Sequence, residues 1–351
     1  MSAADLSADE DALRALWVPF ENGDIALPRD GRVLFVGARA SVGLQRFATR
    51  KWCCEQTFKP FADALQRAGF AVREAADDER FACVLLLLPR QRDERRALFA
   101  HALAHVDDGG VVVASVANRE GARSAQDDMA LLTGATQSLS KHKCRVFWAH
   151  PQAITVDADL LSAWQAHAVL RETASGLASR PGLFAWDRID AASALLAECL
   201  PDDLHGRVAD LGAGAGFLSV ALLRRCPGVT ALDLFEADAR ALPAARRNLE
   251  AACTSLGRDV AVQCHWHDVA AGVPGTFDAV ISNPPFHQGH AELPELGRAF
   301  IVAAANALRS GGTLWMVANQ RLPYEATLRA HFAGVRTVVE RDGYKVIEAT
   351  R

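Results

Sequence analysis

The sequence predicts an α/β protein built from two tandem domains, each with a parallel sheet covered by helices on both faces. Short apolar runs alternate with helical stretches along the 351 residues, which is typical of βαβ units. The two halves of the chain also repeat the same landmarks in the same order. In the second half, a glycine-rich turn joins an apolar strand to a helix, as expected at the ligand-binding edge of a parallel sheet.

The repeated landmarks predict an internal duplication. Four segments of the first half have counterparts in the second: 32–37 with 207–212, 81–90 with 277–286, 116–118 with 317–319, and 144–146 with 344–346. Glycine and proline at residues 175–182 mark a boundary between the halves. We therefore expect domains at residues 1–150 and 181–351, joined by a linker at residues 151–180.

The glycine-rich turn of the second half has the features of a cofactor site. Gly212, Gly214 and Gly216 follow a strand and precede a helix that begins at Phe217. Glycine allows positive φ and close approach of a ligand, but a dinucleotide site would have the spacing G-x-G-x-x-G. Asp210, two residues before the turn, could hold a cationic ammonium. The pattern favours S-adenosylmethionine over a nucleotide phosphate, with a purely structural turn as the alternative.

The next two predicted strands also end in acids. Residues 229–236 end in Glu236, twenty residues after the last glycine, where a carboxylate can bind both ribose hydroxyls. Asp233 competes for this role, but it lies inside the strand. Residues 264–268 end in Asp268, where an adenine amino group would need an acceptor.

The strand at residues 277–282 ends abruptly at Asn283, which two prolines follow. The Asn283 amide and the Pro284 carbonyl can both accept hydrogen bonds from an –NH2 group, and Phe286 offers a flat face to a ring. The alternative is an Asn-Pro turn that only reverses the chain. If the motif is functional, Asn283, Pro284 and Phe286 are the expected catalytic residues.

Together, motifs from most of the chain resemble the ribosomal small-subunit guanine-N2 methyltransferase C family, which is S-adenosylmethionine-dependent and belongs to class I. The segments that carry the resemblance are 181–184 with Asp190, 210–217, 282–289 (SNPPFHQG), 317–319, 322–324 and 344–346. Glu236 departs from the family, in which an aspartate is common, although the longer acid should still reach a ribose. SNPPFH with the following glycine is the specific part of the pattern.

The resemblance implies two Rossmann-like methyltransferase domains and a monomeric protein. It also implies which residues of the second domain bind S-adenosylmethionine: Asp210, Gly212, Gly214, Gly216, Glu236, Asp268 and Asn283. The segment that contains Phe184 would help to close the cofactor and substrate site. Phe184 as an ordinary core residue is the alternative.

The first domain is predicted to be degenerate. Leu87 stands where Asn283 stands, Arg90 replaces Phe286, and Arg39 lies in the turn that corresponds to the glycine-rich one. Positions 33 and 84 are 51 residues apart, whereas 208 and 280 are 72 apart. The shortfall of 21 residues predicts the loss of about one β-α unit from the region that holds the ribose-binding acid.

The charge of the chain limits the kinds of partner that it can bind. The net charge of −4 argues against a nucleic-acid partner held by bulk attraction, so local clusters matter more. Basic residues gather twice in the first half: Arg90, Arg92, Arg95 and Arg96, then Lys141, His142, Lys143 and Arg145. We expect Arg90, Lys141, Lys143 and Arg145 to contact RNA, with solvated faces and a purely structural first domain as alternatives.

No apolar run reaches the length of a membrane span, and the start of the chain lacks the pattern of a signal peptide. The eight cysteines show no C-x-x-C spacing, which favours reduced thiols and a cytoplasmic protein. Neither His265 and His267 nor His287 and His290 have further ligands at the usual spacing, so no metal is expected. Two more helices are expected, at 159–172 and at 296–308, the second closed by glycines 311 and 312.

The sequence thus predicts methyl transfer from S-adenosylmethionine to a guanine N2 amine in 16S rRNA, either free or in the 30S subunit. Other amines fit the same acceptors: a guanine of 23S rRNA, adenine N6, or the side-chain amide of a protein glutamine. A different class is a non-catalytic ribosome-assembly protein in which both halves bind RNA.

Overall fold

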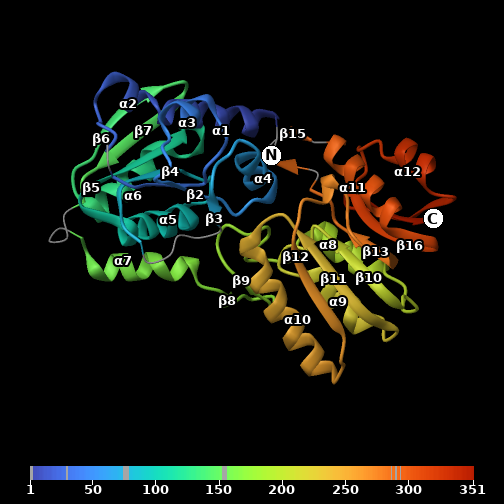
Figure 1. The fold of residues 1–351 in the computed structure, drawn as a ribbon. Coiled ribbons are helices and arrows are strands. Elements are labelled where there is room, and N and C mark those ends of the chain that lie inside the picture. The colour runs from blue at the N-terminus through green and yellow to red at the C-terminus, as the bar shows by residue number, and fades with distance from the viewer. Residues whose placement is uncertain are drawn as a thin grey trace. The chain divides into compact units, whose positions relative to one another are not determined.

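The computed structural model describes residues 3–28, 31–73, 79–151, 156–285, 287–288, 291–292 and 294–351. The chain forms two compact units, which Figure 1 shows with their helices and strands. The N-terminal unit consists of Ala4–Val169 with Arg180–Gly182. The main parts of the C-terminal unit are Leu170–Ser179 and Leu183–Arg351. Phe286 lies outside the described residues, and so do Gly289 and His290.

The C-terminal unit contains a seven-stranded sheet in the order β12-β11-β10-β13-β16-β18-β17. Its strands are β10 (Gly206–Leu211), β11 (Val229–Glu236), β12 (Ala261–Trp266), β13 (Phe277–Ser282), β16 (Leu308–Asn319), β17 (Gly334–Arg341) and β18 (Tyr344–Thr350). The first five strands in this order pair in parallel, and β18 pairs antiparallel with both β16 and β17. The strands predicted at 229–236 and 277–282 are confirmed with the same bounds.

Helices flank this sheet (Figure 1). They are α8 (Ala191–Cys199), α9 (Phe217–Arg225), α10 (Leu242–Leu256), α11 (Pro294–Ala307) and α12 (Glu325–His331). Helix α9 contacts α8 and α10, and α11 contacts α12. The helix predicted at 296–308 is present as α11, but glycines do not end it. Strand β16 begins directly at Leu308, and Gly311, with φ 77°, lies inside that strand.

The N-terminal unit repeats this arrangement with a seven-stranded sheet in the order β3-β2-β1-β4-β5-β7-β6. Its strands are β1 (Val33–Val36), β2 (Trp52–Glu55), β3 (Val72–Arg73), β4 (Phe81–Leu87), β5 (Val106–Ala117), β6 (Gln137–Lys141) and β7 (Cys144–Ala149). Its helices are α1 (Ala3–Leu16), α2 (Val18–Asn22), α3 (Val42–Phe47), α4 (Lys59–Arg67), α5 (Arg92–His105), α6 (Ala122–Thr133) and α7 (Ala158–Gln165). The predicted fold class, two tandem Rossmann-like domains, is confirmed.

The predicted loss of a β-α unit from the first domain is wrong, because every strand of the second sheet has a counterpart in the first. Shorter elements account for part of the missing length. Strand β2 has 4 residues where β11 has 8, and α4 has 9 residues where α10 has 15. The distance between two landmarks in a sequence does not distinguish a shortened unit from a deleted one.

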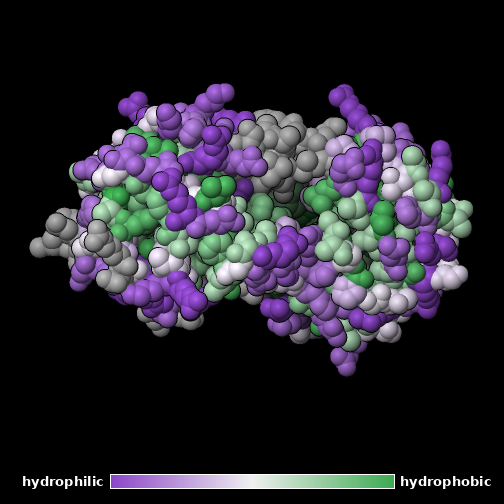
Figure 2. Space-filling view, turned by 45° about the horizontal axis from the view of Figure 1, so that its top comes forward, coloured by the Kyte–Doolittle hydropathy of each residue, from purple (hydrophilic) through white to green (hydrophobic). Residues whose placement is uncertain are grey.

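The helix predicted at 159–172 is too long. Helix α7 ends at Gln165 and a short 3-10 turn follows at Ala166–Ala168. Arg171–Glu172 then forms β8, which pairs with β9 (Ala178–Ser179). No helix in the described part of the chain has both the length and the apolar character that a bilayer crossing requires. Figure 2 shows hydrophilic residues over much of the visible surface, with smaller hydrophobic areas between them.

Candidate active site

The sheet of the C-terminal unit brings the predicted site residues to one edge. The last residue of β10 pairs with Phe235 of β11 and with Ser282 of β13. The residues that follow these three positions, Gly212, Glu236 and Asn283, therefore leave the sheet at the same level. This is the carboxyl edge, where open parallel sheets bind their ligands.

The glycine-rich turn has a backbone that favours glycine at three positions. Gly212, Gly214 and Gly216 have φ values of 76°, 53° and 84°. A Cβ added at Gly214 would meet no described atom within 4 Å, whereas one at Gly216 would lie 3.4 Å from Ala245. Gly216 thus serves the packing of the turn, and Gly214 leaves open space in which a ligand can approach the backbone.

Glu236 is tied to this turn by backbone hydrogen bonds. The Gly214 N–H donates to Glu236 Oε2 at 2.7 Å, and the Asp238 N–H donates to Oε1 at 2.8 Å. Burial raises the pKa of Glu236, and the two backbone donors oppose the rise. The sequence-based competitor, Asp233, is 2% exposed and accepts hydrogen bonds from Arg207 and His265 at 2.8 Å. Glu236 is therefore the acid that the fold presents at the end of β11.

Asp268 lies two residues beyond the end of β12. It caps a short 3-10 turn, where its Oδ1 accepts a hydrogen bond from Ala270 N–H at 3.0 Å. Next to it on the chain, the ring of His267 is hydrogen-bonded to the Gly272 carbonyl. Among the described residues, no group of three or more His, Cys, Asp or Glu side chains is placed to hold a metal ion.

Asp210 is fully buried beneath the glycine-rich turn. Its Oδ2 accepts a hydrogen bond from Ser219 Oγ at 2.6 Å, while its Oδ1 receives none from the part of the chain that the structure describes. Burial raises the pKa of Asp210 to about 7; the Ser219 hydroxyl opposes the rise and the Glu236 carboxylate adds to it. A buried carboxylate oxygen without a donor fits a site completed by a cationic or N–H-bearing ligand.

The buried Asp210 should make the stability of the cofactor-free protein depend on pH. Its folded-state pKa, about 7, lies above the ordinary value of 3.8, so the protonated form contributes stability that is complete below the lower value. That stability is lost as the pH rises through about 7, and we expect an effect on the order of 2–4 kcal/mol. Asp210→Asn, which keeps the side chain neutral, should remove this loss. Denaturant unfolding at about pH 5 and about pH 8 tests the expectation, and equal pH slopes in both proteins would contradict it.

Asn283 is held by residues that come ninety positions earlier in the chain. Its Nδ2 donates to Asp190 Oδ2 at 3.0 Å and to Ser193 Oγ at 2.7 Å. Asp190 is the N-cap of α8, and Ser193 lies in the first turn of that helix. Pro284, the next residue, is buried. Sequence reasoning missed Ser193 altogether, and no local pattern identified it.

The residues expected to close the substrate site or to contact RNA lie in both units. Phe184, in the C-terminal unit, is 69% exposed, which excludes its alternative role as a core residue. Arg90, Lys141 and Lys143 of the N-terminal unit are exposed, whereas Arg145 is half-buried and donates to Gln126 Oε1 at 3.0 Å.

The four arginines at 90–96 do not form one open basic surface. Arg92 and Arg96 contact the buried Asp128 carboxylate at 2.8 Å and 3.1 Å. Arg95 is 3% exposed and donates to the Glu120 carbonyl. Arg92 and Arg96 are therefore the partners that a buried aspartate requires, and the burial of Arg95 keeps it from RNA.

The N-terminal unit carries altered counterparts of the cofactor residues. Register along β1 and β2 places Gln56 where Glu236 stands. Gln56 Nε2 donates to the Ala38 carbonyl at 2.7 Å, and Gln56 Oε1 accepts from Phe58 N–H at 2.8 Å. Arg39, at the position of Gly214, lies over the Phe61 ring at 4.1 Å. An amide and a cation thus replace the carboxylate and the open glycine.

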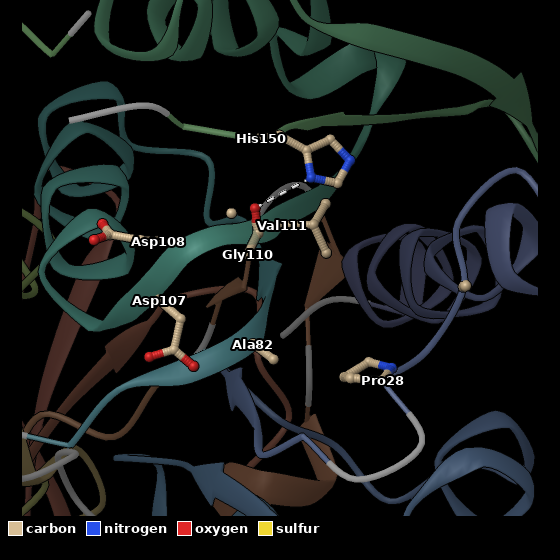
Figure 3. Close-up of a pocket in the computed structure, with 9 residues that line it drawn as sticks. Pro28, Ala82, Asp107, Asp108, Gly110, Val111 and His150 are labelled. Carbon is tan, nitrogen blue, oxygen red and sulfur yellow. Dashed lines mark hydrogen bonds between the residues drawn. The ribbon is translucent and has the colours of Figure 1, made fainter. Parts of the chain in front are cut away.

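A pocket of about 320 Å³ in the N-terminal unit lies at the opposite edge of the sheet (Figure 3). It is lined by residues before β1, by the first residues of β5, and by His150, whose Nδ1 is 3.2 Å from the Gly110 carbonyl. The amino ends of the parallel strands meet here, so this pocket is not the counterpart of the site in the C-terminal unit.

Comparisons with known proteins agree with this geometry. A family model described as "Methyltransferase small domain" matches residues 175–348. The chain is similar to the T. thermophilus 16S rRNA N2 methyltransferase, a structure solved in complex with AdoMet and guanosine. The TM-score is 0.77 at 24% identity, over 97% of this chain and 91% of that one. At this identity the likeness shows the fold alone. Because the match covers nearly all of both chains, the shared fold includes both domains.

Curated relatives carry one shared name, ribosomal RNA small subunit methyltransferase C. The relative from Escherichia coli O9:H4 is 32% identical over 284 residues, which is 80% of this chain and 79% of that protein. The one from Klebsiella pneumoniae is 32% identical over 276 residues, or 78% and 77%. The relative from Pseudomonas paraeruginosa is 30% identical over 272 residues, or 77% and 80%. The family predicted from the sequence motifs is confirmed, and the chain belongs to the ribosomal RNA small subunit methyltransferase C family.

Proposed function

We propose that this protein transfers a methyl group from S-adenosylmethionine to the exocyclic N2 amine of a guanine in 16S rRNA. The observation that carries the proposal is the Asn283 amide at the sheet edge. Its Nδ2 donates to Asp190 and Ser193, and its oxygen receives no hydrogen bond from the part of the chain that the structure describes. The T. thermophilus enzyme of similar fold is a 16S rRNA N2 methyltransferase acting at guanosine 1207. The names of the curated relatives also support a small-subunit rRNA substrate.

The residues of the C-terminal unit fit S-adenosylmethionine. Asp210 has a buried oxygen without a described donor, which suits the ammonium of the methionine part. Gly214 leaves the backbone of the turn accessible, and Glu236 lies where a ribose can be bound. Asp268, beyond the neighbouring strand, is the acceptor proposed for the adenine amine. Because Gln56 and Arg39 replace Glu236 and Gly214 in the N-terminal unit, we expect one cofactor per chain.

When bound, S-adenosylmethionine supplies an electrophilic methyl group, so the protein's main task is alignment. The lone pair of a guanine N2 is delocalised into the ring. Asn283 Oδ1 and the Pro284 carbonyl would accept its two N–H groups and turn that lone pair toward the methyl. As the N–C bond formed and the methyl–sulfur bond broke, leaving its electron pair on sulfur as a thioether, positive charge would develop on nitrogen, and the same acceptors would stabilise it. The nitrogen then releases a proton to water. Phe286 is proposed to stack on the guanine, which must leave any base pair to enter.

Parallel transfer of tritiated methyl to isolated small subunits, large subunits, free 16S and 23S rRNA and protein tests the substrate. The proposal expects label in 16S rRNA, free or in the small subunit. Label in 23S rRNA or in protein would replace it with another amine. A chain that fails to bind S-adenosylmethionine by calorimetry would instead be a non-catalytic RNA-binding protein.

The N-terminal unit is proposed to dock RNA through the turn between β6 and β7. His142 and Lys143 occupy positive φ values of 52° and 57°, and the Lys143 carbonyl accepts from Asn118 N–H at 2.9 Å, just beyond the end of β5. This contact places the turn at the carboxyl edge of the N-terminal sheet. Lys141, Lys143, Arg145 and the exposed Arg90 would then meet phosphates.

Charge reversal at the turn should weaken RNA binding without slowing the chemistry. Lys141→Glu combined with Lys143→Glu should raise the KM for RNA roughly tenfold, leave kcat unchanged and reduce the salt dependence of binding. A matched control, Arg50→Glu with Arg67→Glu, makes the same charge change at exposed positions beside the amino edge of this sheet. If both double variants raise KM equally, the turn has no specific part in docking.

A single chain in solution and a cytoplasmic location are further parts of the proposal. The internal duplication already supplies two sheet edges to one molecule, and ribosomal RNA is found in the cytoplasm. Sedimentation at micromolar concentration tests the monomer directly.

A further inference from the structure

The orientation of the Asn283 amide is set by α8. Both donor contacts of Nδ2 end on this helix, at Asp190 Oδ2 and at Ser193 Oγ, with distances of 3.0 Å and 2.7 Å. An Asn amide carries two N–H donors on nitrogen and two lone pairs on oxygen. With both donors used on one side, Oδ1 is directed to the other side, where it receives no hydrogen bond from the described residues.

The reverse orientation of the amide is unfavourable for a chemical reason. A rotation that exchanged Nδ2 and Oδ1 would place the amide oxygen against the Asp190 carboxylate, where two acceptors would meet without a proton between them. The same rotation would present N–H groups to the substrate amine, which itself brings N–H groups. Asp190 therefore selects the orientation that can accept hydrogen bonds, and a neutral residue with donor and acceptor ends would select it less strongly.

Asp190 and Ser193 are themselves fixed. Asp190 Oδ2 accepts the Ser193 backbone N–H at 2.9 Å as the N-cap of α8, and Ser193 is 7% exposed. Helix α8 contacts α9 and β16, so its first turn is anchored to the same sheet that carries Asn283. Asparagine caps helices about as well as aspartate does, so the capping role alone does not require a charge at this position.

We infer that Asp190 and Ser193 are positioning residues that hold the Asn283 amide with its oxygen toward the substrate amine. The inference rests on the proposed function for its catalytic meaning. The contact between α8 and the end of β13 stands independently of it.

A reciprocal pair of substitutions tests the inference. Asp190 Oδ2 accepts both the Ser193 N–H and Asn283 Nδ2. In Asp190→Asn the amide oxygen can take that place and keep the cap, but the charge that fixes the Asn283 amide is lost, and we expect kcat to fall roughly 3- to 10-fold. Asn283→Asp places two carboxylates about 3 Å apart and should reduce kcat more strongly. Combining the two substitutions places one donor and one carboxylate in exchanged positions, with the amide nitrogen at residue 190 facing the carboxylate at residue 283 and the Ser193 N–H losing its cap oxygen. The double variant should recover activity by about tenfold or more over Asn283→Asp alone.

Two controls separate positioning from general damage. Asp157→Asn makes the same change at the N-cap of α7, where Asp157 Oδ1 accepts from Asp159 N–H and Leu160 N–H. It should leave kcat unchanged. The affinity for S-adenosylmethionine should stay within about threefold of wild type in Asp190→Asn, because the cofactor residues are untouched.

The outcomes separate the inference from the proposed function. If wild type methylates rRNA but Asp190→Asn keeps the wild-type kcat, or the double variant is no better than Asn283→Asp, the inference is overturned. If wild type transfers no methyl to any amine, the proposed function fails. In that case thermal unfolding without cofactor tests the inference. The unfolding midpoints of wild type, both single variants and the double variant are compared. A double variant more stable than the sum of the single effects supports the Asp190–Asn283 contact, and additive effects overturn it.

Discussion

Asn283→Ala is expected to lower kcat roughly 100- to 1,000-fold while the Kd for S-adenosylmethionine changes by less than about threefold. The substitution removes the acceptor that aligns the substrate nitrogen and stabilises the positive charge developing on it. The donor contacts of Asn283 end on Asp190 and Ser193 and not on the glycine-rich turn, so the cofactor residues keep their places. Single-turnover methyl transfer together with calorimetry measures the two effects separately.

The control for this substitution is Asn306→Ala, the same change at an exposed position of α11. It should leave both kcat and Kd at wild-type values, because exposed helix positions tolerate alanine. Wild-type turnover by Asn283→Ala would show that the amide is not part of the active site. A large rise in the Kd for S-adenosylmethionine would instead show that Asn283 serves the cofactor.

Gly214→Val is expected to abolish measurable cofactor binding, with a rise in Kd of roughly 100-fold or more. The backbone at Gly214 has φ 53°, and no described atom lies within 4 Å of the added Cβ, so the new side chain would occupy the space left for the ligand. Positive φ in a residue with a Cβ costs about 1–2 kcal/mol, so the fold should survive. Calorimetric titration and denaturant unfolding on the same samples measure both effects.

Gly257→Val separates ligand exclusion from backbone strain. Gly257 follows α10, has φ 61°, and likewise meets no described atom within 4 Å. The two variants should lose similar amounts of stability, and only Gly214→Val should lose cofactor affinity. Equal affinities in both would remove Gly214 from the cofactor site.

Much of the C-terminal unit was predictable from the sequence because its signals are local. The strand at 277–282 is apolar and is stopped by two prolines, and the glycines of the turn mark positive φ directly. Glu236 was favoured over Asp233 because it ends its strand, and the structure shows Asp233 already paired with Arg207. Residues that end neighbouring parallel strands meet in space wherever they lie in the chain.

Tertiary contacts were not predictable in the same way. Ser193 reaches Asn283 across ninety residues of chain, and nothing near either residue indicates the pair. The arginines at 92, 95 and 96 look in the sequence like a basic surface, yet a buried Asp128, outside their local window, binds two of them. The spacing between landmarks in the first domain indicated a deletion, because length alone does not show that β2 and α4 are merely short.

Identification of the methylated nucleoside tests the central claim most directly. Small subunits and free 16S rRNA, incubated with S-adenosylmethionine and either wild type or Asn283→Ala, are digested to nucleosides and analysed by mass spectrometry. N2-methylguanosine from 16S rRNA in the wild-type reaction, and its loss with Asn283→Ala, is the predicted result. A methyl group on another base or another position, or equal N2-methylguanosine from both proteins, would contradict the assignment of Asn283 as the acceptor of a guanine amine.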